Sequence, residues 1–350
     1  MGRDRVTLFT QPMTRRTLLK GGGTLALAMT GGQLAGLLPP AHAQGMLSLS
    51  EQLGWLANAQ MAGDFVATSK GYFKDAGIDL KIQPGGPNID AVQVVAGGGI
   101  PMGNVSSVAV LVNARSHGLP VKAFATALQK HPFAFIFLTK SGIRTPRDFA
   151  GKTIGIQATA RPLLEAVLAK YQIPPDKVKV LFVGGDTHPL VTGQVDVITG
   201  WIIDAPQIAA VRQAGSYSYF PLWDLGIRLY AYTYFTTDKM LSERKDALVR
   251  FTAASAKGWL YAAQHPDEAA DIVIKSTTGL DRTLELQTWK NEIPYMFSPL
   301  TKQAGWGAMD PKVWTAISDT YYGLKQIPQA VPATDVMTTE IVEMAKTPKV

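Results

Sequence analysis

The chain of 350 residues contains no cysteine. Disulfide scaffolds, thiolate metal sites and cysteine nucleophiles are therefore excluded. A chain of this length can bury cores that are stable without cross-links. After residue 43 the sequence also has no apolar run of the roughly twenty residues that a membrane-spanning helix needs. These absences indicate a soluble, globular protein beyond that point.

Catalytic and metal-binding patterns are missing as well. The five histidines show no H-E-x-x-H or related spacing, and no G-x-S-x-G sequence occurs. The glycine triplet at 97–99 lacks the spacing of a phosphate-binding loop and is not followed by Lys-Ser or Lys-Thr. We therefore expect a binding protein and not an enzyme, with no catalytic residue, no metal and no cofactor.

Much of the positive charge is concentrated at the N-terminus. The formal net charge is +7, and the first 43 residues hold five positive charges and one negative charge, so +3 remains after them. This small excess, without a cluster of Lys and Arg among aromatic residues, gives no indication of nucleic-acid binding.

Residues 1–43 have the pattern of an export signal. The segment 14–20 is similar to a twin-arginine motif, a stretch rich in Gly, Ala and Leu follows, and 41–43 is a small-x-small cleavage pattern. Glycines and Gln33 interrupt the apolar stretch, which disfavours a membrane anchor. We expect cleavage and export to the periplasm by the twin-arginine route, with the general secretory route as the alternative.

From Leu47 onward, strand-like and helix-like segments alternate with short polar connections. This order is typical of α/β domains with largely parallel sheets. We expect strands at 47–49, 79–82, 102–107, 121–128, 133–139 and 228–237, and helices at 65–73, 89–95, 108–115, 242–263, 267–276, 284–292 and 311–324. The apolar strands at 133–139 and 228–237 bracket a complete α/β unit, as crossovers between two lobes would. The prediction is lobe 1 at 45–136 plus 236–350, and lobe 2 at 137–235.

The stretch 54–80 has the order polar loop, helix, turn and strand. Trp55 opens the loop, and Asp64 stands directly before the helical pattern, where it is expected to be the N-cap. A loop at a helix N-terminus beside an aromatic residue can hold a small polar or anionic ligand. The alternative is an ordinary connection in which Trp55 belongs to the core.

Within this stretch, Trp-x-x-Asn-x-x-x-Ala-Gly from Trp55 and the segment 70–80 resemble the thiamine-precursor (NMT/Thi-type) family of periplasmic solute-binding proteins. Further along, 147–156 and 195–201 resemble segments of the second lobe in that family. The family captures substrates for ABC importers of thiamine pyrimidines, riboflavin, sulfonates, taurine and nitrate. Met61 stands where a histidine usually precedes the Ala-Gly pair.

The resemblance implies a two-lobed periplasmic-binding-protein fold (type II) of the α/β class, with two crossover strands that act as a hinge. It implies a small-molecule ligand, a membrane permease as partner and a monomeric chain. We expect a pyrimidine precursor of thiamine or a riboflavin-like N-heterocycle. An aliphatic sulfonate, taurine or another small anion is the alternative.

The family also contains enzymes and sensors. Its pyrimidine synthases use pyridoxal phosphate, but the missing cysteine, Met61 and the export signal make that activity a remote alternative here. A periplasmic sensor domain that reports to a receptor would have the same fold.

Recognition of a flat heterocycle requires an aromatic face and hydrogen-bonding groups at the ring edge, inside a cleft that can close. In open α/β sheets, such groups lie on loops at the carboxyl ends of strands. The candidate ligand-binding residues are Trp55, Asn58, Asp64, Ser106, Ser107, Gln129, Thr159, Arg161, Trp201, Asp204 and Tyr232.

Each candidate also has a structural interpretation. Trp55 and Trp201 are expected to stack on the ligand, with core packing as the alternative. Asn58 and Asp204 offer hydrogen bonds to the ring edge, or equally cap a turn and a helix. Thr159 is predicted to be the N-cap of the helix that begins near residue 162.

Arg161 is the best indicator of an anionic ligand, because a guanidinium group suits a carboxylate, sulfonate or phosphate. A salt bridge between the lobes is the alternative for this residue. Tyr232 and Tyr234 lie in the second crossover strand, with side chains on one face by the period of two.

Overall fold

A computed structural model describes residues 46–86, 89–157 and 160–350. The export signal predicted at 1–43 lies outside these ranges, and so does Thr159. Over the described ranges, no helix is both long enough and apolar enough to cross a membrane.

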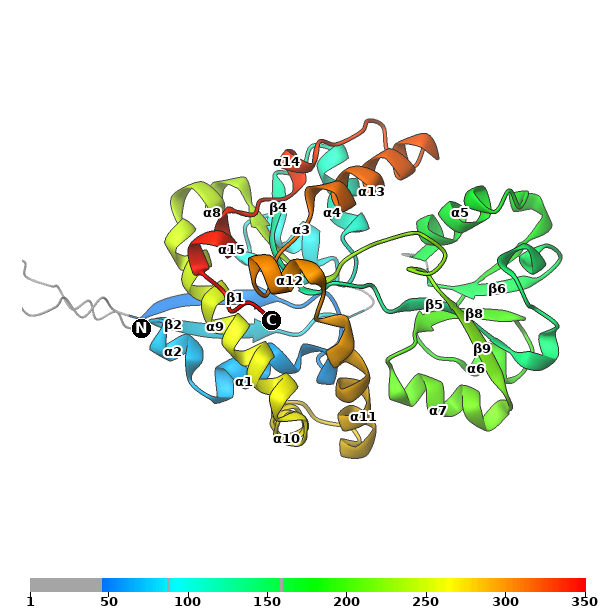
Figure 1. Ribbon diagram of the computed structural model, residues 1–350, viewed down its shortest axis with the longest axis horizontal. Coiled ribbons are helices and arrows are strands. Elements are labelled where there is room, and N and C mark those ends of the chain that lie inside the picture. The colour runs from blue at the N-terminus through cyan, green and yellow to red at the C-terminus, as the bar shows by residue number, and fades with distance from the viewer. Residues whose placement is uncertain (1–45, 87–88, 158–159) are drawn as a thin grey trace, which may run out of the picture. The chain divides into compact units, whose positions relative to one another are not determined.

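The first lobe is built on a five-stranded sheet with the order β2-β1-β3-β10-β4 (Figure 1). Its strands are β1 (Leu47–Gln52), β2 (Ile78–Gln83), β3 (Met102–Val105), β4 (Val121–Leu128) and β10 (Ala231–Thr237). Strand β1 is parallel to β2 and β3, whereas β10 is antiparallel to both of its neighbours. The expected α/β alternation is confirmed, with one strand running against the others.

The second lobe repeats this arrangement. Its sheet has the order β7-β6-β8-β5-β9. The strands are β5 (Phe133–Leu138), β6 (Thr153–Ile156), β7 (Lys179–Phe182), β8 (Val197–Trp201) and β9 (Tyr217–Pro221). Here β5 is the antiparallel strand, paired with β8 and β9. The polar loops after β6 and β8 therefore lie at the same edge of this sheet, because these two strands are parallel.

The chain passes between the sheets twice, at 129–132 between β4 and β5 and at 222–230 between β9 and β10. The boundaries expected at 136/137 and 235/236 fall inside β5 and β10, and each of these strands belongs entirely to one sheet. We therefore propose that the two lobes meet at these connections, a few residues before each strand. The strand expected from residue 228 begins only at Ala231, because the residues before it belong to the connection between the two sheets.

Helices cover the faces of both sheets (Figure 1). The first lobe has α1 (Ala62–Ser69), α2 (Tyr72–Asp75), α3 (Ala91–Ala96), α4 (Ala109–Ser116), α8 (Asp238–Glu243), α9 (Lys245–Gln264), α10 (Pro266–Ser276), α11 (Arg282–Glu292), α12 (Pro299–Ala304), α13 (Pro311–Gly323), α14 (Ala333–Val336) and α15 (Glu340–Ala345). The second lobe has α5 (Arg161–Lys170), α6 (His188–Val191) and α7 (Ala205–Ala214). Short 3-10 turns are η1 (Ala59–Met61), η2 (Thr139–Ser141), η3 (Pro146–Phe149), η5 (Pro175–Lys177) and η6 (Ile293–Tyr295).

The helix expected at 65–73 is interrupted. Helix α1 ends at Ser69, Gly71 has a φ of 78°, and α2 begins at Tyr72. This left-handed conformation is readily adopted by glycine, which has no Cβ. The N-cap of α1 is Met61, and Asp64 lies inside the first turn. The N-cap prediction for Asp64 is therefore wrong.

Helix α1 rests directly on α9 through two glycines. A Cβ on Gly258 would overlap the carbonyl of Gly63, and a Cβ on Gly63 would overlap the ring of Trp259. Only glycine permits this close approach of the two helices. The contact fixes the start of α1 and thereby the loop at 54–58 that leads into it.

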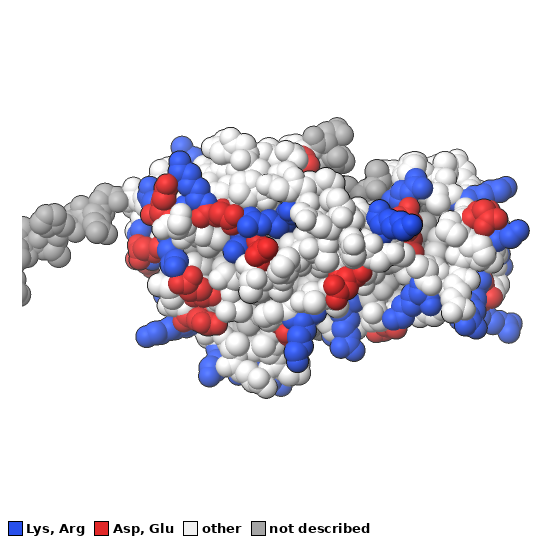
Figure 2. Space-filling view, turned by 90° about the horizontal axis from the view of Figure 1, so that it is seen from above, with Lys and Arg blue, Asp and Glu red and all other residues white. Residues whose placement is uncertain are grey.

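The core of the first lobe is dense in aromatic side chains. It contains Phe73, Phe124, Tyr232, Tyr234, Phe251, Trp259, Trp289 and Trp306. The tail aromatics Trp259, Trp314 and Tyr321 are buried, as their helical spacing predicts, while Tyr322 is 52% exposed. Basic and acidic side chains alternate over the face drawn in Figure 2, without a large patch of one sign there.

Candidate ligand-binding site

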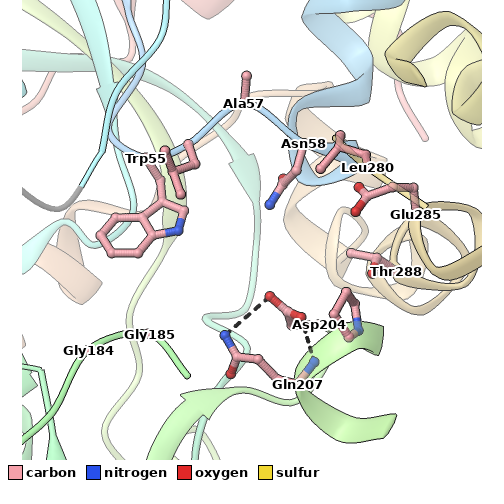
Figure 3. Close-up of a pocket in the computed structure, with 12 residues that line it drawn as sticks. Trp55, Ala57, Asn58, Gly184, Gly185, Asp204, Gln207, Leu280, Glu285 and Thr288 are labelled. Carbon is pink, nitrogen blue, oxygen red and sulfur yellow. Dashed lines mark hydrogen bonds between the residues drawn. The ribbon is translucent and has the colours of Figure 1, made fainter. Parts of the chain in front are cut away.

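A cavity of about 410 Å³ lies where the two lobes meet (Figure 3). This volume is within the range of ordinary small-molecule sites. The first lobe contributes the loop Trp55, Leu56, Ala57 and Asn58, then Leu280 just before α11, and Glu285 and Thr288 on α11. The second lobe contributes Gly184, Gly185, Asp204, Pro206 and Gln207. Three of the predicted site residues, Trp55, Asn58 and Asp204, are thus brought together.

Trp55 provides the aromatic wall of the cavity. Its carbonyl accepts a hydrogen bond from the N–H of Gly85 at 3.1 Å, which holds the loop. A Cβ on Gly185 would lie 3.7 Å from Cζ2 of Trp55, so the indole ring approaches the backbone of the second lobe. The ring is half-buried, and one side of it faces the cavity (Figure 3).

Asn58 has a capping role as well as a place in the cavity wall. Its Oδ1 accepts a hydrogen bond from the N–H of Gln60 at 2.9 Å, at the start of η1. This bond orients the side chain, and the amide nitrogen is directed toward the cavity (Figure 3).

Asp204 is the N-cap of α7, as one of the two interpretations of the sequence predicted. Its Oδ1 accepts from the N–H of Gln207 at 3.1 Å, and its Oδ2 accepts from Nε2 of Gln207 at 3.3 Å and from Nε2 of Gln60 at 3.5 Å. Burial raises the pKa of Asp204, and the Gln207 N–H partly opposes that rise. Every one of these donors is neutral, so the carboxylate charge has no cationic partner among them.

Glu285 was not predicted from the sequence. It lies on α11, is only 4% exposed, and its Oε2 accepts a hydrogen bond from the N–H of Ala59 at 2.7 Å. Its carboxylate faces Trp55 across the cavity (Figure 3). Burial raises the pKa of Glu285, and the negative charges of Asp204 and Asp281 raise it further. In the sequence it resembles any acidic residue in the first turn of an exposed helix.

Helix α11 also joins the lobes beside the cavity. The N–H of Ala205, at the start of α7, donates to Oγ1 of Thr288 at 3.0 Å. Nδ2 of Asn291 donates to the carbonyl of Ile203 at 3.2 Å. One helix of the first lobe thus binds the N-terminus of a helix of the second.

Trp201 and Tyr232 lie outside the cavity wall. The Trp201 ring contacts His131 and Tyr232 edge-on, each with a centroid distance of 5.4 Å. The Tyr232 hydroxyl donates to Oε1 of Gln60 at 3.0 Å, and Gln60 in turn donates to Asp204. Tyr232 has a φ of 45°, a strained conformation for a bulky residue. Through its hydrogen bond to Gln60, Tyr232 can influence the position of the Asp204 side chain at the cavity.

Four other predicted residues do not line the cavity. Asp64 is buried and accepts from the Tyr234 hydroxyl at 2.7 Å. Both atoms of the Gln129 amide are used, since Nε2 donates to the Ala308 carbonyl and Oε1 accepts from Ser298, each at 2.9 Å. Ser106 and Ser107 are half-buried after β3. Ligand roles for these residues, and for Thr159, remain predictions.

Arg161 also lies away from the cavity wall. It is on the exposed side of α5, where Nε pairs with Oε1 of Glu165 at 2.8 Å, one helical turn away. The interlobe salt bridge considered for Arg161 is not observed. Instead, Glu165 accepts from Nε2 of Gln326 in the first lobe at 2.7 Å.

The cavity therefore combines an aromatic face with two carboxylates, Asp204 and Glu285, and two amides, Asn58 and Gln207. Among the described residues that line it, none is a lysine or an arginine. Carboxylates accept hydrogen bonds and attract positive charge. This arrangement suits a flat ligand that carries hydrogen-bond donors or a positive charge at its edge.

Comparison with known proteins gives a family match. A family model described as NMT1/THI5 like matches residues 58–269. The formylaminopyrimidine-binding protein of Halalkalibacterium halodurans is 24% identical over 293 residues, 82% of this chain and 88% of that protein. The riboflavin-binding protein RibY of Chloroflexus aurantiacus is 26% identical over 305 residues, 83% of this chain and 84% of that protein.

The relatives also include an enzyme. The 4-amino-5-hydroxymethyl-2-methylpyrimidine phosphate synthase of Legionella pneumophila is 23% identical over 249 residues, 69% of this chain and 78% of the enzyme.

Solved structures show the same fold. The alkanesulfonate-binding protein SsuA of Xanthomonas axonopodis pv. citri, bound to MOPS, has a TM-score of 0.63 at 16% identity, over 85% of this chain and 100% of that chain. The periplasmic aliphatic sulphonate binding protein SsuA of Escherichia coli has a TM-score of 0.65 at 14% identity, over 83% and 92% of the two chains. The predicted periplasmic-binding-protein fold is thus confirmed.

Proposed function

The chain belongs to the NMT1/THI5-like family, and from this premise we propose that it captures a small, planar N-heterocycle in the interlobe cavity for an ABC importer. The ligand class is a pyrimidine precursor of thiamine or a riboflavin-like ring. The observation that carries this proposal is that the Trp55 ring and two carboxylates, Asp204 and Glu285, line the same cavity (Figure 3).

Each part of the cavity has a task in this proposal. The indole of Trp55 stacks on the ring, which is favourable for any flat aromatic ligand. Asp204 and Glu285 accept hydrogen bonds from exocyclic amines or ring N–H groups, and the amide nitrogen of Asn58 donates at another edge. Because Trp55 and Glu285 belong to one lobe and Asp204 to the other, closure of the lobes brings both sets of groups to the ligand.

A sulfonate or another small anion is the alternative ligand. In the described part of the cavity wall an anion would meet carboxylates and no lysine or arginine. Arg161, the residue that favoured an anion, pairs with Glu165 instead. The charge of the wall therefore supports a heterocycle over an anion.

We also infer that the protein is not an enzyme. A synthase that holds pyridoxal phosphate needs a lysine for the Schiff base, and no lysine is among the described residues of the cavity wall. The binding-protein relatives match more of this chain than the synthase does, 82% and 83% against 69%. In this proposal the protein is exported to the periplasm by the twin-arginine signal, acts as a monomer and delivers its ligand to a membrane permease.

A thermal-shift screen of the purified protein tests the proposal. The panel contains pyrimidines, thiamine, riboflavin, sulfonates, taurine and nitrate. A ligand at a hundred times its dissociation constant stabilises the folded state by about 2.7 kcal/mol and raises the melting temperature. We expect a shift with a heterocycle that is lost in Trp55→Ala. A shift with anions alone would overturn the heterocycle assignment.

A further inference from the structure

The ionisable residues at the cavity carry charge of one sign. Asp204 and Glu285 line it, and Asp281, which lies at the N-cap of α11, raises the pKa of Glu285 further. Helix α11 also has two cations, but they pair with acids of α10. Arg282 pairs with Asp271 and Asp267, and Lys290 with Asp267. Their charges are therefore compensated on the side of α11 that faces α10.

A second layer of acidic groups lies behind the wall. Glu292, seven residues after Glu285 on α11, is completely buried, and neither of its oxygens has a hydrogen-bond partner in the part of the chain that the structure describes. Burial raises its pKa far above the usual range. Burial raises the pKa of the Tyr232 hydroxyl, and the nearby acidic groups Glu292, Asp204, Glu285 and Asp64 raise it further. The groups that face Asp204 and Glu285 from β10, α1 and α11 are thus neutral or negative.

The carboxylate of Glu285 is directed into the cavity and has an oxygen that can still accept a hydrogen bond. Within the described residues, Oε2 of Glu285 accepts a hydrogen bond from the N–H of Ala59, and its Oε1 accepts none. The side chain is 4% exposed and projects toward Trp55 (Figure 3). A carboxylate packed among protein atoms gains more from a cation than a surface carboxylate does, because its surroundings screen the charge less than bulk water does. Trp55 adds to this attraction, since the face of an indole ring attracts a cation.

We propose that the heterocycle is an amino-substituted pyrimidine and that the cavity binds its protonated, cationic form, with the ring against Trp55 and its N–H donors shared by Asp204 and Glu285. The proposal rests on the proposed function, because it presupposes that this cavity is the ligand site. The proton comes from solvent, resides on a ring nitrogen of the ligand while it is bound, and returns to solvent on release. A neutral amino-substituted pyrimidine therefore takes up one proton when it binds.

The pH dependence follows from this uptake. The bound ligand keeps its proton to a higher pH than the free ligand, so affinity rises as pH falls between the two ligand pKa values. Below the pKa of the free ligand the affinity becomes constant. At still lower pH it decreases, as Asp204 and Glu285 become protonated. Burial raises the pKa of both carboxyls, so this decrease begins at a higher pH than it would for surface carboxylates.

Titration calorimetry of the purified protein with 4-amino-5-hydroxymethyl-2-methylpyrimidine tests the proposal. At one pH, above the pKa of the free pyrimidine, the titration is repeated in buffers that differ in ionisation enthalpy. The slope of the observed enthalpy against that ionisation enthalpy gives the number of protons taken up. We expect close to one proton per ligand, and close to none at a pH below the pKa of the free pyrimidine.

Two conservative variants keep the fold while removing charge. In Glu285→Gln the amide oxygen still accepts from Ala59, and in Asp204→Asn the side chain still caps α7. We expect each to weaken binding about tenfold or more, the scale of a lost charge-assisted hydrogen bond, and to reduce proton uptake. Asp319→Asn, at an exposed position on α13, is the matched control and should bind as the wild type does.

The outcomes separate the two proposals. Pyrimidine binding without proton uptake, or undiminished binding by both Glu285→Gln and Asp204→Asn, overturns the cationic form and leaves the binding function intact. Absence of binding by every heterocycle overturns both.

Discussion

Two tryptophans of the first lobe lie near carboxylates and have different surroundings. Trp259, on α9, is 1% exposed, and its Nε1 donates to the Tyr234 hydroxyl, which donates to Asp64, each at 2.7 Å. Trp55 is half-buried on a loop and faces Asp204 and Glu285 across the cavity (Figure 3). The residue types are alike, but one set is enclosed by the core and the other borders a cavity.

The two regions differ in whether a ligand can reach the carboxylate. In the core, Oδ2 of Asp64 accepts from the Tyr234 hydroxyl, and the side chain is only 1% exposed, so no ligand can reach it. Burial accordingly raises the pKa of Asp64 to about 6. At the cavity, the second carboxylate oxygen of Glu285 borders a space that a ligand can enter. A tryptophan with a carboxylate thus indicates a binding site only where it borders such a space.

The largest expected effect is on folding. Trp259→Ala removes a buried indole and leaves the Tyr234 hydroxyl without its donor. The free energy of unfolding should fall by about 3–5 kcal/mol, as for other buried aromatic residues cut back to alanine. Urea denaturation measures it. In Trp55→Ala, the matched variant at the cavity, the loss should be smaller, about 1–2 kcal/mol, because that ring is only partly buried. Equal losses of unfolding free energy in Trp259→Ala and Trp55→Ala would contradict the difference between the core and the cavity.

The second expected effect is the pH dependence of stability in the core. Because its folded-state pKa lies near 6, above the ordinary 3.8, the folded protein holds the proton of Asp64 where the unfolded chain releases it. Wild-type stability should therefore fall relative to Asp64→Asn as pH rises from about 4 to about 6, by roughly 2–3 kcal/mol. Urea titrations at several pH values measure this difference. A difference independent of pH would contradict the assignment.

The third expected effect is on binding at the cavity. Trp55→Ala should weaken heterocycle binding by about 1–3 kcal/mol, the scale on which a base stacks on an aromatic side chain. Titration calorimetry with a pyrimidine measures the change. Tyr322→Ala, at an exposed aromatic residue on α13, should leave affinity unchanged. An unchanged affinity in Trp55→Ala would argue that this wall does not contact the ring.

The smallest expected effect is at Arg161. It pairs with Glu165 on the exposed side of α5, and such a pair is worth only a few tenths of a kcal/mol. Arg161→Ala should therefore change unfolding free energy by about 0.5 kcal/mol or less, and should leave heterocycle affinity unaltered. The same calorimetry and urea titration apply. Anion binding that disappears in this variant would favour the sulfonate alternative.

Much of the fold was predictable because its signals are local. The apolar runs at 121–128 and 133–138 form β4 and β5, and the order of strands and helices predicts an α/β fold. Asp204 before Ala-Pro indicated an N-cap, and that interaction involves residues only three positions apart. Trp55 and Asn58 were assigned to a loop at the site because they precede a helix and follow a strand.

Other properties depend on residues that are far apart in the sequence. Glu285 and Ala59 are separated by 226 positions, yet the N–H of Ala59 donates a hydrogen bond to Oε2 of Glu285 at 2.7 Å. Nothing near Glu285 in the sequence distinguishes it from a surface acid. The environment of a charged side chain is set by the elements packed against it, and these come from distant parts of the chain.

The sequence by itself determined the class of fold, the order of its elements and the loops on which a ligand site could lie. These follow from hydrophobic periodicity and capping, which act over a few residues. Only the tertiary structure decided that Asp64 belongs to the core and that Asp204 and Glu285 share a cavity. Burial and the meeting of two lobes are sums over long-range contacts, and no local pattern encodes them.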